Sequence, residues 1–154
     1  MSANEAIQTK NLSTEVVVNI FRDGFRASRV ITDPNATDRP DDGEFILTSY
    51  PSTDVFFPLI VVEEFDDASD RIDSQGDLHQ HEYSVQISIY AYSNTNLYKI
   101  RDEIRHFLEQ EYKNFMSDGF AEPTIESSTA ANWESDPKVQ KWEMVVSGLV
   151  HTYV

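Results

Sequence analysis

The chain has 154 residues, and 27 Asp and Glu against 12 Lys and Arg give it a formal charge of −15. It has no cysteine, which excludes disulfides, thiolate metal sites and cysteine nucleophiles, and it lacks the clustered cations that neutralise nucleic-acid phosphates. Its longest apolar run, 55–62, is far shorter than the ~20 residues of a membrane span, and the first twenty residues have no basic start or apolar stretch, so we expect one domain over 1–154 without a secretory signal.

The N-terminal residues 1–12 are expected to form a loose segment, and a helix is predicted to follow them. Ser13 or Thr14 can accept hydrogen bonds from the first free amides and so begin the helix. Apolar residues then recur at helical spacing: Val16, Val17, Ile20, Phe21 and Phe25. A short strand is predicted at 29–32.

Residues 33–77 carry most of the negative charge. They hold 13 carboxylates against Arg39 and Arg71, which is −11 of the total of −15. Two acidic loops are predicted here: a long one at 33–54, with the apolar residues 45–47 as its only anchor, and a second at 66–77. The acidity fits either a surface that repels polyanions or an adaptation to high salt.

The remaining elements follow from hydrophobic periodicity. A β-branched and aromatic stretch at 55–65 predicts a strand, and strict alternation at 81–92 predicts another with one face in the core. An apolar stripe at spacings of three and four predicts an amphipathic helix at 94–117, which Ser93 or Asn94 can cap. Two further strands are predicted at 123–128 and 139–154.

The predicted order is therefore helix, strand, strand, helix, strand, strand. Strands that follow one another without an intervening helix favour antiparallel pairing. We expect an α+β fold: a mainly antiparallel four-stranded sheet with two helices packed on one face. The other face would present Ser84, Gln86, Ser88 and Tyr90, which suits water or a wet subunit contact.

Candidate metal and catalytic sites are weak. His79 and His81 have a spacing that can hold zinc, but no third ligand is visible. The acidic residues Asp66, Asp67, Asp70, Asp73 and Asp77 lack the spacing of a calcium-binding EF-hand. There is no Gly-x-Ser-x-Gly turn and no glycine-rich phosphate loop. We therefore expect no enzyme activity, no catalytic or metal-binding residues and no cofactor.

Four large aromatic residues are candidates for an oligomer or partner interface: Tyr90, Tyr92, Trp133 and Trp142. Aromatic side chains of this kind are enriched at protein interfaces. Ordinary core packing explains them about equally well.

The order of elements resembles the tail terminator, or tail-completion, proteins of long-tailed phages and tailed archaeal viruses. The resemblance covers roughly residues 13–154. It depends on the Phe-Pro-Leu-Ile-Val stretch at 57–61 and on the alternating strand at 83–92, which leads directly into a long amphipathic helix.

The resemblance implies a structural virion protein that forms a ring, usually a hexamer, at the head–tail junction or top of the tail, after assembly in the host cytoplasm. Its partners would be further copies of itself, the tail tube protein and the head–tail connector protein, with no membrane. DNA would pass through the lumen without specific binding, and the acidic residues at 66–77 would suit such a lumen. The acidity would fit a virus of a halophilic archaeon.

Two alternatives remain open at the level of sequence. One is another head–tail connector component, a stopper or adaptor. The other is a cellular, monomeric ligand-binding α+β domain from a halophile.

Overall fold

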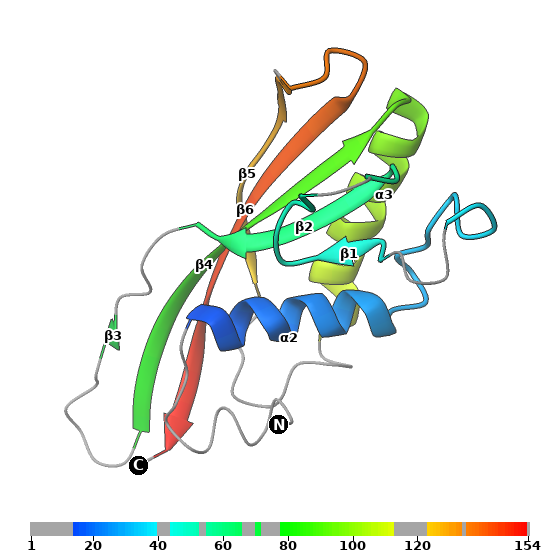
Figure 1. The fold of residues 1–154 in the computed structure, drawn as a ribbon. Coiled ribbons are helices and arrows are strands. Elements are labelled where there is room, and N and C mark those ends of the chain that lie inside the picture. Colours follow the sequence, from blue (N-terminus) through cyan, green and yellow to red (C-terminus); the bar gives the residue numbers. More distant parts are fainter. Residues whose placement is uncertain are drawn as a thin grey trace.

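In a computed structural model of the chain, the helices pack on one side of a twisted sheet (Figure 1). The structure describes residues 14–39, 44–52, 55–65, 70–71, 78–112, 123–133 and 135–153. The helices are α2 (Thr14–Ala27), α3 (Asn94–His106) and the π-helix η1 (Phe107–Glu111). The strands are β1 (Ile46–Leu47), β2 (Leu59–Glu64), β3 (Asp70–Arg71), β4 (Leu78–Ala91), β5 (Thr124–Ala131) and β6 (Gln140–Tyr153). None of the described helices is long and apolar enough to cross a membrane.

The sheet confirms the α+β class but not the expected four antiparallel strands. Its order is β1-β2-β4-β6-β5, with β3 paired to β4 outside this path. The additional strand β1 lies in the predicted loop 33–54 and runs parallel to β2, with Ile46 opposite Ile60. An apolar run as short as 45–47 shows no periodicity, so nothing in the sequence distinguished this strand from a loop anchor.

The segment before β1 is attached to the sheet by Arg39. The side chain of Arg39 is nearly buried, and its Nε donates to Asp33 Oδ2 at 2.6 Å. The same guanidinium donates to the carbonyl oxygens of Phe56 and Pro58, at 2.9 and 2.7 Å. Residues 33–39 are therefore an ordered turn at the start of β2 and not part of a free loop.

The strand predicted at 29–32 does not form. Residues 29–31 make a bend, in which Ser28 Oγ accepts hydrogen bonds from the amides of Val30 and Ile31, at 3.0 and 3.3 Å. A serine that captures amides two and three residues ahead offers the backbone an alternative to a strand ladder.

Helix α3 begins as predicted, because Ser93 Oγ accepts from the amide of Asn96 at 3.2 Å. The α-helical part stops at His106 and continues as η1, in which Phe107 makes an edge-to-face contact with Phe25 of α2 at 5.1 Å. The predicted residues 113–117 lie outside the described residues.

Strands β4 and β6 form the longest ladder, from Leu78 opposite Tyr153 to Ala91 opposite Gln140. Their alternation directs one set of side chains to the helices, as predicted. This core contains Val85, Ile87 and Ile89 of β4 with Met144 and Val146 of β6, all 0% exposed.

Gly148 is required by the close approach of Tyr83 from β4. A Cβ at position 148 would lie 2.5 Å from the hydroxyl oxygen of Tyr83. The buried ring of Tyr83 therefore occupies the space that a larger residue would need.

Candidate interaction surface

The sheet face opposite the helices is the first candidate for an interaction surface. Sheet register places Glu63, Gln86, Val145 and Ser127 in one row across the strands. The next row consists of Val61, Ser88, Glu143 and Thr129, of which Val61 is fully buried. We call this the open face, because both helices contribute to the core cluster on the other side of the sheet. Its composition is mostly polar, as the alternation in β4 predicted. The expectation that Ser88 and Tyr90 face water is wrong, because both are buried, at 1% and 3% exposed.

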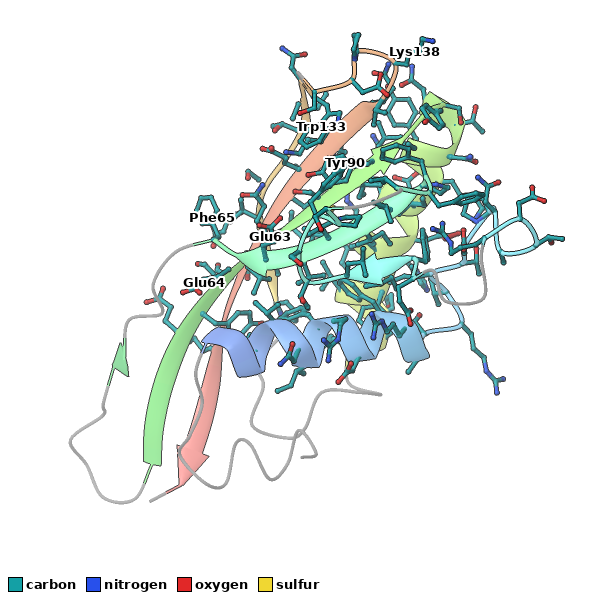
Figure 2. All side chains as sticks on the ribbon, viewed as in Figure 1. Glu63, Glu64, Phe65, Tyr90, Trp133 and Lys138 are labelled. Atoms are coloured by element: carbon teal, nitrogen blue, oxygen red, sulfur yellow. The ribbon has the colours of Figure 1, made fainter. Side chains whose placement is uncertain are left out.

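One end of the open face carries an aromatic cluster. Tyr90, Trp133 and Tyr50 are in mutual contact, with ring centroids 4.9 to 5.2 Å apart. Tyr90 is only 3% exposed, and the segment around Tyr50 covers it together with the loop that carries Trp133. Two of the predicted interface residues, Tyr90 and Trp133, are therefore neighbours in a small second core (Figure 2).

Lys141 adds a positive charge next to this cluster. Its Nζ lies 5.2 Å from the ring centroid of Tyr90 and 5.3 Å from that of Trp133, and it pairs with Glu143 at 2.9 Å. Burial lowers the pKa of Lys141, but the hydrogen bond to Glu143 and the nearby phenol of Tyr90 outweigh burial, and the net pKa is raised. The ammonium is thus kept charged against the aromatic rings, where a cation is attracted by their π-electrons.

The other two predicted aromatic residues lie elsewhere. Trp142 is on the helix side of β6, where its Nε1 donates to Ser128 Oγ at 2.8 Å and Arg101 stacks over its ring at 4.7 Å. Tyr92 follows β4, is 60% exposed and touches Phe57 edge-on at 4.9 Å. The four residues therefore do not form one continuous patch, and their role at an interface stays a prediction.

The predicted acidic lumen falls mostly outside the described residues. Asp66, Asp67, Asp73 and Asp77 are not described, and of Asp70 only the backbone is described, paired with His81 in the β3–β4 ladder. Within the described residues, no three His, Asp or Glu side chains group as they would around a metal ion.

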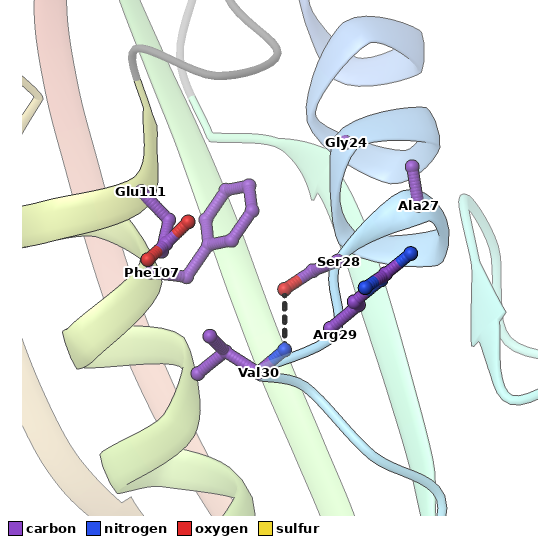
Figure 3. Close-up of a pocket in the computed structure, with 7 residues that line it drawn as sticks. All are labelled: Gly24, Ala27, Ser28, Arg29, Val30, Phe107 and Glu111. Atoms are coloured by element: carbon purple, nitrogen blue, oxygen red, sulfur yellow. Dashed lines mark hydrogen bonds between the residues drawn. The ribbon is translucent and has the colours of Figure 1, made fainter.

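A pocket of about 410 Å³ lies between the end of α2, the bend that follows it and η1 (Figure 3). Most of its lining is apolar and comes from Gly24, Ala27, Val30 and Phe107, while Arg29 and Glu111 supply charge. The Ser28–Val30 hydrogen bond fixes the bend that forms one wall. No sequence pattern indicates this pocket, because the pocket depends on the π-helical turn of η1 and on a bend where a strand was predicted.

A comparison with solved structures finds the same fold in a virion. One chain of a structure described as the virion of a native gene transfer agent (GTA) particle matches with a TM-score of 0.59 at 14% identity. The match covers 86% of this chain and 91% of the other. No protein-family model and no curated protein matches the sequence. The chain therefore shares its overall fold with a component of that particle.

Proposed function

We propose that the protein is a structural subunit of a tailed virion, and that it acts as a tail terminator. In this role six copies form a ring that caps the finished tail tube, and the opposite side of the ring binds the head–tail connector. The ring is located at the head–tail junction, and the protein has no enzymatic activity and no cofactor.

The single observation that carries the proposal is the shared fold with a chain of the gene transfer agent virion. The match extends over nearly the whole of both chains, so it is not a local similarity of one helix and two strands. The order of elements also resembles that of tail terminator proteins, a resemblance carried by the stretch at 57–61 and by the alternating strand at 83–92.

The charge and the open face support the same proposal. A net charge of −15 repels the DNA backbone, so DNA can pass through a ring of such subunits without being held. The polar open face offers Glu63, Gln86, Thr129 and Glu143 for a contact that includes water, as is usual for interfaces between separately folded subunits.

Binding to tail tubes tests this function. The purified protein, labelled with gold, is mixed with isolated tail tubes of the virus that encodes it and examined by electron microscopy. We expect label at one end of each tube. Label along the whole tube, or at the connector face of isolated heads alone, would contradict the terminator role, and the latter would favour a stopper or adaptor.

A further inference from the structure

Phe65 forms an exposed apolar knob at the end of β2. Its side chain is 52% exposed, although its amide still donates to the carbonyl oxygen of Ser84 and so holds its backbone in the sheet. Glu63 and Glu64 precede it and are both exposed (Figure 2). No described residue forms an ion pair with either carboxylate. Glu64 lies opposite Val85 on the helix face, whereas Glu63 lies on the same face as Phe65. The knob therefore combines the ring of Phe65 with the carboxylate of Glu63.

The pocket beside η1 has one charged residue of each sign in its lining, Arg29 and Glu111. It is mainly apolar, and its volume of about 410 Å³ lies at the lower end of the ~300–1,000 Å³ typical of ligand pockets, which is ample for one aromatic ring. Arg29 is exposed at its edge, and within the described part of the chain no carboxylate pairs with it. An unpaired arginine is unusual in a chain with more than two acids for each cation.

Knob and pocket lie near opposite ends of helix α2. Helix α2 and strand β2 run in opposite directions, so the end of β2 is near the start of α2, and the pocket is at the other end of that helix (Figure 1). A 14-residue helix is about 21 Å long, so one molecule cannot place its own knob in its own pocket.

We propose that Phe65 of one copy inserts into the pocket of the next copy, and that Arg29 there pairs with Glu63, which lies on the same face of the sheet as Phe65. This inference rests on the proposed ring function, and it names the contact that builds the ring. Because the two surfaces differ, the contact is heterologous, and repeated heterologous contacts generate a closed ring when the rotation between copies closes. A buried aromatic residue beside an arginine is also the usual composition of an interface hot spot.

Charge reversal on each side tests the contact. The variants Arg29→Glu and Glu63→Arg each place like charges together when assembled alone, and we expect each to weaken assembly at least tenfold in light scattering. Mixed in equal amounts, they restore both pairings if the two variants alternate around the ring, so the mixture assembles again. Lys138→Glu makes the same change in net charge as Arg29→Glu in a loop remote from the pocket, and it should assemble like the unmodified protein (Figure 2).

The outcomes separate this contact from the ring itself. If both charge variants and Phe65→Ala form rings as readily as the unmodified protein, the contact is wrong while the ring function stands. If the single variants fail but the mixture is not rescued, Arg29 faces a different surface and the proposed pairing is wrong. If the unmodified protein is monomeric in dilute and molar salt and with tail tubes, the ring and the contact are both wrong.

Discussion

Arg39 shows how one side chain can order an acidic segment. It is an isolated cation within 33–54, and its five donors match one carboxylate and two carbonyl oxygens at the start of β2. Phe45 and Phe56 lie 5.3 and 5.5 Å from its guanidinium carbon and shield the ion pair from water. The residue therefore links the turn at 33–39, strand β1 and strand β2.

Arg39→Met should destabilise the protein by about 3–5 kcal/mol, because the variant leaves the carboxylate of Asp33 nearly buried without its partner. The free energy of unfolding in urea measures this loss. Arg22→Ala is the matched control, since its pair with Asp23 is solvent-exposed and should contribute under about 1 kcal/mol. Equal losses in the two variants would contradict the structural role of Arg39.

The buried phenol of Tyr83 should make the free energy of unfolding depend on pH in the alkaline range. Burial raises the pKa of its phenol above 10, with a smaller contribution from Tyr112. Above pH 10 the unfolded chain therefore loses this proton first, and the free energy of unfolding falls as pH rises. Below pH 10 both states keep the proton, and this residue adds no pH dependence.

Tyr83→Phe should make this alkaline loss less steep, by up to about 1.4 kcal/mol per pH unit. Urea unfolding of both proteins at several values between pH 9.5 and 11.5 gives the two slopes. The slopes are compared, not the absolute stabilities, because the substitution also changes packing in the core. Identical slopes would show that Tyr83 titrates in the folded protein as it does in the unfolded chain.

At the scale of elements, helix α3 holds the core together along one stripe. Leu97, Ile100, Ile104 and Leu108 are all at most 2% exposed and lie at the spacings of three and four that the sequence showed. The stripe continues from α3 into η1 without interruption, so the change from α- to π-helical turns leaves its buried side facing the sheet.

Leu108→Asp should abolish folding, because it places an unpaired carboxylate at a position that is 0% exposed. Thermal unfolding followed by circular dichroism tests this expectation. Glu109→Asp is the control at the exposed neighbouring position and should melt within a few degrees of the unmodified protein. A normal melting transition for Leu108→Asp would show that the buried side of this helix is wrongly assigned.

Periodic elements were predictable, and elements that depend on tertiary contacts were not. The alternation in β4 and the stripe of α3 correctly gave the core face of each element. The bend at 29–31 depends on the hydroxyl of Ser28, and strand β1 depends on pairing with Ile60. In η1, Phe107 packs on Phe25 of α2. Hydrophobic periodicity reports none of these contacts.

The candidate surfaces were predictable only in part, for the same reason. The polar character of the open face follows from alternation within one strand. The separation of Trp142 from Tyr90 follows from the register between β4 and β6, in which Tyr90 lies opposite Lys141 and Trp142 lies opposite Ile89. The pocket beside η1 could not be predicted, because two segments far apart in the sequence form it.

For the molecule as a whole, the charge of −15 predicts a dependence on salt. At 0.1 M salt charges interact over about 10 Å, and at 1 M over about 3 Å, so molar salt screens most of the self-repulsion. We expect the melting temperature to rise by several degrees between 0.1 and 1 M KCl. An unchanged or lower melting temperature would mean that attractive ion pairs, such as Lys99–Glu103, outweigh the repulsion.

The measurement that tests the central claim most directly is the native mass by light scattering, in molar salt, in dilute buffer and with isolated tail tubes. A ring predicts a discrete species of about six times 17.7 kDa, favoured by molar salt, or a monomer that assembles on addition of tubes. A monomer of 17.7 kDa that responds to neither salt nor tubes would contradict the account.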